Sequence, residues 1–326
     1  IAILFVFMLF GMVLETFGIA LIIPVLGIIT NPNFLIDYPI AASISNYFGS
    51  PTRIQLVVGS MIIMSIAFLI KSVFLIYMGW KQSKFQADLR VFMSKKLFSG
   101  YMFQPYTFHL QRNSAELIRN ITGEMFEFLV TISSVMTLVA EVLILIGVCT
   151  LLFIVEPYGF ISVISLIIVI GSAFYFSTKK KILKWGEERQ HHDGKLLQHL
   201  QQGLGGVKDV KLLGRESEFI KQYQSHTSKS AYIGIRYGLY QMIPRYLFDL
   251  LAVISMTMLV LIMIAQGKSI DTFVTSLGVF AVAAFRLMPS ANRLLNSVQS
   301  LRYNIPVVDK IYNEINMFNA SSNKPE

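Results

Sequence analysis

Residues 54–80 read IQLVVGSMIIMSIAFLIKSVFLIYMGW and are followed directly by Lys81 and Lys84. A membrane-spanning helix needs about 20 mostly apolar residues, so this run is long enough to cross a bilayer. Further apolar runs lie at 1–29, 125–155, 158–178, 246–266 and 270–289. Only helices and closed barrels satisfy their backbone hydrogen bonds in hydrocarbon, and runs of this length indicate helices. We therefore predict an all-α membrane protein with six transmembrane helices.

Composition supports the membrane interpretation. The charged fraction is 14% and the mean hydropathy is +0.59, whereas soluble domains carry about 25% charged residues. The net charge of +9 could suggest nucleic acid, but the basic residues gather in two loops beside apolar runs, which argues against that partner. Cys149 is the only cysteine, which excludes an intrachain disulfide and a thiolate metal cluster.

The basic residues fall on alternate sides of the predicted helices. Segment 81–119 carries seven and segment 179–245 carries thirteen. The loops at 30–53 and near Gly267 carry one each, and the turn at 156–159 carries none. Because cytoplasmic loops are enriched in Lys and Arg, the two basic segments and both ends of the chain are predicted to be cytoplasmic.

The two cytoplasmic segments continue with a helical pattern of charged and apolar residues, over 80–99 and 179–211. Helix-breaking residues follow, at Gly100–Pro105 in the first segment, and at Gly203–Gly206 and Gly214 in the second. We expect two helical hairpins that reach into the cytoplasm, each with a short tip.

On the outer side, residues 34–48 are weakly amphipathic. They either lie flat on the outer leaflet or form a partly ordered loop.

This arrangement resembles the transmembrane half of an ABC exporter. YMFQPYTF at 101–108 followed by NSAELI at 113–118 resembles that family's first coupling helix and the start of its third spanning helix. GVKDVKLLGRESEF at 206–219 is similar to the stretch that leads into the second coupling helix. The resemblance implies that a nucleotide-binding domain contacts the tips through these residues: Gln104, Pro105, Tyr106, Thr107, Gly214, Arg215 and Glu216.

Shorter motifs are similar to the bacterial flippase for lipid-linked oligosaccharides of protein N-glycosylation. They are ETFGIALIIP at 15–24, NITGE at 120–124, IPR at 243–245 and RLMPSANR at 286–293. The resemblance implies a bacterial inner membrane protein that pairs with a second copy of itself, or with a different chain.

The family's nucleotide-binding domain is absent from these residues. Gly267-Lys268-Ser269 has Ile262 where a P-loop requires its first glycine. We interpret 1–326 as one transmembrane domain that opens inside its first helix, with no catalytic site and no cofactor of its own. ATP and Mg²⁺ are expected in the missing domain, on the same polypeptide or another.

Ionisable residues inside membrane segments cost about 2.5 to 3.5 kcal/mol each and are candidates for function. The ones to explain in this chain are Glu15, Lys71, Glu141, Arg245, Asp249, Arg286 and Arg293. Arg286 and Arg293 are seven residues apart, which is two turns and roughly 10 Å along one helix face. Pro289 between them is expected to kink that helix and re-aim one guanidinium.

With Lys71 and Arg245, these two arginines would form a cationic belt, a name used below for these four residues. Guanidinium groups bind phosphate through paired, charge-assisted hydrogen bonds, and lysine supplies a point charge. Similarity to the flippase implies that the belt lines a central cavity and contacts the lipid's pyrophosphate, although lysine at 71 replaces the arginine of the family member. Alternatively, these cations extend toward headgroups or pair with Glu141 and Asp249.

We therefore predict the transmembrane half of an ATP-driven flippase for an isoprenoid pyrophosphate-linked oligosaccharide. An ABC exporter of another lipid, peptide or drug, and a membrane scaffold that transports nothing, remain alternatives. His191, His192 and Asp193 are interpreted as a solvated helix face rather than a metal site, because no further ligand follows at suitable spacing.

Overall fold

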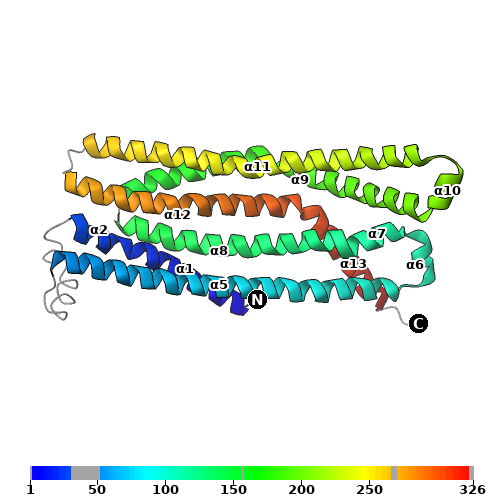
Figure 1. Cartoon of the computed structure of the whole chain (residues 1–326), viewed down its shortest axis with the longest axis horizontal. Helices are drawn as coiled ribbons and strands as arrows, with labels where there is room; N and C mark the ends of the chain where they lie inside the picture. The colour runs from blue at the N-terminus through cyan, green and yellow to red at the C-terminus, as the bar shows by residue number, and fades with distance from the viewer. Residues whose placement is uncertain (1, 31–51, 156, 266–269, 323–326) are drawn as a thin grey trace. The chain divides into compact units, whose positions relative to one another are not determined.

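The computed structural model describes residues 2–30, 52–155, 157–265 and 270–322, which are helical almost throughout (Figure 1). The helices of the first half are α1 (Ala2–Ala20), α2 (Ile22–Thr30), α5 (Arg53–Met102), α6 (Tyr106–Gln111), α7 (Ser114–Arg119), the π-helical turn η1 (Asn120–Glu124) and α8 (Met125–Val155). Those of the second half are α9 (Pro157–Gly205), α10 (Val207–Leu212), α11 (Glu216–Ala265), α12 (Ile270–Tyr303) and α13 (Ile305–Ser322).

The predicted apolar runs are helical where the structure describes them, and α8 has the predicted bounds of 125–155. The first run differs, because it divides into α1 and α2 around Leu21. Pro24 explains the division, since it has no N–H to donate to the carbonyl of Ala20 one turn earlier.

Three helices are long and apolar enough to cross a membrane among the residues searched, namely Ala2–Ala20, Ile54–Met102 and Ser114–Ile154. The other three predicted spans contain residues whose side chains lie outside the described part of the chain. The all-helical membrane fold is therefore confirmed, and the count of six spans stays a prediction.

The long helices confirm the predicted projections. α5, α9 and α11 contain 50, 49 and 50 residues, so each is about 75 Å long at a rise of 1.5 Å per residue. The hydrocarbon core of a bilayer is about 30 Å thick, so each helix extends well beyond it.

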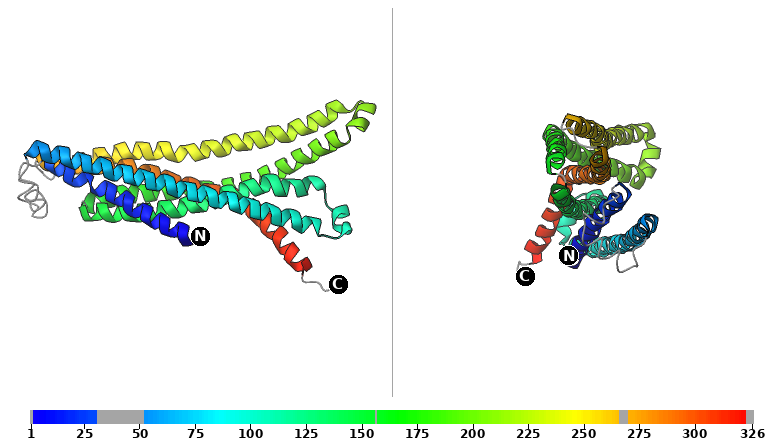
Figure 2. Two further views of the ribbon diagram at one scale, coloured as in Figure 1. Left: turned by 60° about the horizontal axis from the view of Figure 1, so that its bottom comes forward. Right: turned by 90° about the vertical axis from the view of Figure 1, so that its left-hand side faces the viewer.

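The tips begin later than the glycines predicted. α5 continues through Gly100 to Met102, and α9 continues through Gly203 to Gly205. A glycine inside a helix costs only about 1 kcal/mol relative to alanine, which a long helix tolerates. Pro105 and Gly214 mark the true turns: Pro105 precedes α6, and Gly214 has a φ of 65°, in the left-handed region that favours glycine. Figure 2 shows α10 between the ends of α9 and α11.

The chain divides into two compact units, and several helices contribute residues to both. Unit 1 comprises 1–82, 138–172 and 245–294, and unit 2 comprises 83–137, 173–244 and 295–326. The core of unit 1 contains these buried side chains: Ile19, Ile144, Val148, Leu152 and Leu287. At Gly147 a side chain would begin 2.3 Å from Thr16 Oγ1, so the small residue lets α8 approach α1 closely.

Unit 2 has two apolar clusters. The first joins α5, α8 and α13 through Leu97, Tyr101, Met125, Val307, Ile311 and Phe318. The second contains Ile182, Ile233 and Tyr303, and the ring of Tyr303 stacks on Tyr237 with centroids 3.8 Å apart. Burial raises the pKa of the Tyr303 hydroxyl to about 12, so this stack is neutral at physiological pH. Gly186 lets α9 approach the end of α12, because a Cβ there would lie 2.0 Å from the Tyr303 carbonyl oxygen.

The predicted outer segment 34–48 and the turn at Gly267-Lys268-Ser269 lie outside the described residues.

Candidate functional site

Lys71 of the cationic belt is held by a carboxylate in unit 1. Its Nζ donates to Glu15 Oε2 over 3.0 Å, and the lysine side chain is 15% exposed. Nζ also lies 4.5 Å from the centroid of the Phe68 ring, within range of a cation–π interaction. Glu15 is thus the partner of a belt residue.

Arg293 is held in the same way. Its Nε donates to Glu141 Oε1, and Ser290 Oγ donates to the other oxygen of that carboxylate. Glu141 and Ser290 are buried, whereas the Arg293 side chain is 41% exposed. The carboxylate therefore fixes the guanidinium while leaving part of it accessible.

The remaining two belt residues are less fully described. Arg245 lies in α11 directly after Pro244, and its side chain is exposed, with no hydrogen bond or ion pair to the rest of the described chain. Arg286 lies in α12, which continues unbroken through Pro289 to Arg293. The side chain of Arg286 is outside the described part, so the structure does not test whether all four belt residues share a cavity.

The first coupling tip presents exposed aromatic rings. Gln104 and Pro105 form the turn after α5, and Tyr106 and Thr107 open α6. Phe103 and Tyr106 are 89% and 75% exposed. Tyr101 is instead buried and accepts a hydrogen bond from Asn120 Nδ2 over 2.9 Å, which anchors the base of the tip.

The second coupling tip combines apolar exposure with local ion pairs. Leu212 and Leu213 at the end of α10 are 74% and 73% exposed. Lys211 pairs with Glu216 at 2.9 Å across the Gly214 turn, and Arg215 pairs with Glu218 at 3.0 Å directly after it. An exposed apolar group framed by charges suits docking against another protein surface. The predicted contacts with a nucleotide-binding domain stay predictions.

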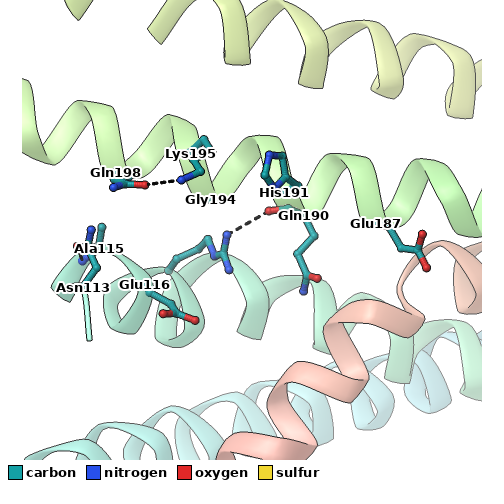
Figure 3. Close-up of a pocket in the computed structure, with 10 residues that line it drawn as sticks. Asn113, Ala115, Glu116, Glu187, Gln190, His191, Gly194, Lys195 and Gln198 are labelled. Atoms are coloured by element: carbon teal, nitrogen blue, oxygen red, sulfur yellow. Dashed lines mark hydrogen bonds between the residues drawn. The ribbon is translucent and has the colours of Figure 1, made fainter. Parts of the chain in front are cut away.

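A polar pocket of about 370 Å³ lies between α7 and α9 in unit 2 (Figure 3). Arg119 crosses it and donates to the carbonyl oxygen of Gln190 over 3.1 Å, and Lys195 donates to Gln198 over 3.2 Å. Arg119 also pairs with Glu124 at 3.3 Å. Because Arg119, the central cation, already has partners, we interpret this pocket as a packing contact between α7 and α9 rather than as a ligand site.

Sequence reasoning missed a group of four histidines, called the histidine cluster below: His191, His192 and His199 of α9 with His226 of α11. His192 Nδ1 and His226 Nδ1 are 2.9 Å apart, which requires one nitrogen to carry a proton and the other to accept it. Burial and the neighbouring histidines lower the pKa of both residues. No group of three metal-ligating residues with suitable geometry occurs among the described side chains.

Two sequence signals could have found these partners. Glu15 and Lys71 have opposite charges in successive apolar runs, where an unpaired charge is costly, so a pair between them could have been inferred on energetic grounds. The histidine cluster had a compositional signal, because four of the five histidines fall between residues 191 and 226.

Comparisons with known proteins agree with this architecture. A family model for the ABC transporter transmembrane region matches residues 1–287. A solved structure of a bacterial Atm1-family ABC exporter with ATP bound matches with a TM-score of 0.70 at 15% identity, over 94% of this chain and 52% of that one. This chain thus spans about half the length of that exporter, and the likeness shows the fold alone. The protein is therefore a membrane protein of the ABC transporter transmembrane region family, with an exporter-type fold.

Proposed function

We propose that this chain is the transmembrane half of an ATP-driven flippase that moves an isoprenoid pyrophosphate-linked oligosaccharide across a bacterial inner membrane. Both ends of the chain lie in the cytoplasm in this proposal. A second copy completes the bundle, and a nucleotide-binding domain supplies the ATP and Mg²⁺ site.

The observation that carries the proposal is Arg293 held by Glu141. A guanidinium fixed through Nε keeps its orientation, so less side-chain entropy is lost when a phosphate oxygen binds. Arg286 lies two turns earlier on the same helix, at a spacing that suits the two ends of a pyrophosphate and its sugar. A neutral drug would not require fixed guanidinium groups inside a membrane segment.

The carboxylates Glu15 and Glu141 also set the strength of binding. Four belt cations set against two carboxylates leave a modest positive charge, rather than four unopposed charges. Such a belt attracts a pyrophosphate and still allows it to leave on the other side, as a transporter requires.

ATP-driven motion would enter through the two tips. Gln104, Pro105, Tyr106 and Thr107 form the first docking surface, and Gly214, Arg215 and Glu216 form the second. The long continuous helices α5, α9 and α11 would carry that motion toward the belt.

The test is ATP-driven translocation of a pyrophosphate-linked oligosaccharide lipid in proteoliposomes made with the full-length gene product. The Arg286→Ala, Arg293→Ala double variant should lose transport and keep ATP hydrolysis. A Lys95→Ala, Lys96→Ala variant removes the same charge from exposed sites outside the belt and should transport normally.

Two other outcomes have clear meanings. ATP hydrolysis without movement of this lipid, or transport that survives loss of both arginines, would indicate an exporter of another amphiphile. Failure to hydrolyse ATP with any nucleotide-binding partner would favour a membrane scaffold.

A further inference from the structure

A second cationic site lies outside the belt, between α9 and α11 in unit 2. It is a cavity of about 450 Å³ with six lining residues: Lys181, Lys184, Trp185, Arg236, Leu239 and Tyr240. The first three belong to α9 and the last three to α11, and each set has the spacing i, i+3, i+4 that places residues on one helix face. Two matching faces therefore meet across this cavity.

The aromatic residues hold the two helices together. The rings of Trp185 and Tyr240 meet edge to face, with centroids 4.9 Å apart and planes at 82°. Tyr240 also lies 6.3 Å from Phe174, in the last turn of the predicted apolar run 158–178. This contact places the cavity beside the end of the run, at the level where tryptophan and tyrosine gather in membrane proteins.

The cations are only slightly neutralised by the protein. Lys184 lies 3.7 Å from Glu188 one turn later, an exposed pair that contributes little. Lys181 and Arg236 have no hydrogen bond or ion pair among the described residues. Three positive charges thus meet at one cavity with one weakly engaged carboxylate.

Distances along α9 give the depth of the site. Lys181 and Lys184 follow Thr178, the last residue of the apolar run, by three and six residues, which corresponds to about 5 and 9 Å. The headgroup layer occupies roughly 5 to 8 Å beyond the hydrocarbon on each side of a bilayer. The lysine side chains can therefore reach phosphates of the cytoplasmic leaflet.

We infer that this cavity binds the phosphate of an anionic phospholipid from the cytoplasmic leaflet, with Lys181, Lys184 and Arg236 as its ligands and Trp185 against the glycerol region. Basic pockets between helices at the cytoplasmic face suit such headgroups. The site is separate from the belt, and the inference does not depend on which substrate the protein transports.

Trp185 provides a direct reporter, because residues 1–326 contain only two tryptophans, and changing Trp80 and any tryptophan outside these residues to phenylalanine leaves one. This full-length protein with Trp185 as its single tryptophan, in phosphatidylcholine vesicles, is titrated with phosphatidylglycerol that carries a nitroxide near the headgroup. Saturable quenching of Trp185 is expected, and equally labelled phosphatidylcholine should quench far less.

Variants identify the ligands. Each cation at an anionic surface contributes about 1 kcal/mol, or about fivefold in affinity. Lipid binding should therefore weaken on the order of a hundredfold in the triple variant Lys181→Gln, Lys184→Gln, Arg236→Gln. A second triple variant keeps all three charges and should bind the lipid as the parent does: Lys181→Arg, Lys184→Arg, Arg236→Lys. The control is a triple variant that removes three exposed charges elsewhere and should bind the lipid like the parent: Lys95→Gln, Lys96→Gln, Lys221→Gln.

Several results would overturn the inference. They are equal quenching by the two lipids, equal weakening by the two glutamine triples, and loss of binding in the charge-keeping variant. Reversal of quenching by millimolar inorganic phosphate would indicate a site for soluble phosphate instead of a lipid.

Discussion

The two units use buried carboxylates for different purposes. In unit 1, Glu15 and Glu141 each hold a cation of the proposed belt. In unit 2, Glu314 pairs with Arg112 at 2.6 Å and joins α13 to the end of α6. Also in unit 2, the Arg189–Glu127 pair joins α9 to α8. The pairs of unit 1 instead lie within apolar helical runs.

This difference teaches that burial of an ion pair does not by itself identify a site. A buried pair is costly to form, so it persists for a structural or a functional reason. In unit 2 the structural reason is visible in the elements it joins. In unit 1 an apolar core already packs α8 against α12, so the proposed belt gives the Glu141–Arg293 pair a role beyond packing.

The largest expected effect is that of Glu141→Ala. This substitution removes the carboxylate to which Ser290 and the Arg293 guanidinium donate inside a membrane segment. The expected cost is about 3 to 5 kcal/mol in the free energy of unfolding. The matched change Glu218→Ala breaks an exposed pair and should cost no more than about 0.5 kcal/mol. Unfolding in mixed micelles measures both, and equal costs would remove the distinction between the units.

Glycine substitutions come next. Gly186→Ala in unit 2 places a methyl group against the backbone carbonyl of Tyr303, which cannot rotate away, so about 1 to 3 kcal/mol should be lost. Gly147→Ala in unit 1 meets the Thr16 side chain, which can change rotamer, and should cost less. Gly234→Ala in α11 meets nothing within 4 Å and should be neutral or slightly stabilising. Thermal unfolding of the three variants tests this order, and a larger loss at Gly147 would reverse it.

A smaller effect concerns pH. His192 and His226 have lowered pKa values in the folded protein, so their contribution to stability is fully present above the unfolded value of about 6.5 and is lost as pH falls through the folded values. Both face other charged or titratable groups, namely His191, His199, Lys229, Glu188 and Asp193. The melting temperature should therefore fall between pH 7.5 and pH 5.5.

Substitutions locate the source of that fall. His226→Gln should flatten the pH dependence, because it removes the partner of the close contact in the histidine cluster. His109→Gln changes the one histidine outside the cluster and should leave the slope unchanged. A slope that both variants share with the parent would place the titrating group elsewhere.

The smallest effect on stability is expected for Arg215→Gln at the second tip. Its exposed pair with Glu218 contributes less than about 1 kcal/mol and is screened by salt. If the tip docks a nucleotide-binding domain as proposed, this variant should nevertheless slow ATP-driven transport. A loss of stability as large as that of Glu141→Ala would contradict an exposed docking role.

The fold was largely predictable because long apolar runs have only one solution in a membrane. Residues 125–155 carried that information completely, and residues 1–29 carried it except for the effect of Pro24. The tips begin later than predicted because a glycine is a weak helix breaker. Pro105 and Gly214 were stronger signals of a turn than Gly100 and Gly203. Helix α13 was not anticipated, because it depends on contacts of Val307 and Ile311 with α5 and α8.

The ionisable residues of the candidate site are visible in the sequence, but their pairing was predicted only in part. The sequence analysis named Glu141 and Asp249 as alternative partners of the belt cations, without saying which cation each would hold. The pair that the structure shows is Arg293 with Glu141, 152 residues apart. Such pairing depends on which helices pack together. The histidine cluster shows the same limit, since His192 and His226 are 34 residues apart on two helices.

The π-helical turn η1 determines the rotation of the helical segment that precedes it. A π-turn accommodates one additional residue, and each residue advances an α-helix by about 100°. Deleting Gly123 would restore a regular helix across 114–155 and turn the faces of α7 by about that angle relative to α8. Arg119 would then lose its hydrogen bond to Gln190, and Asn120 its hydrogen bond to Tyr101. One residue of the NITGE segment thus determines how α7 aligns with α5 and α9.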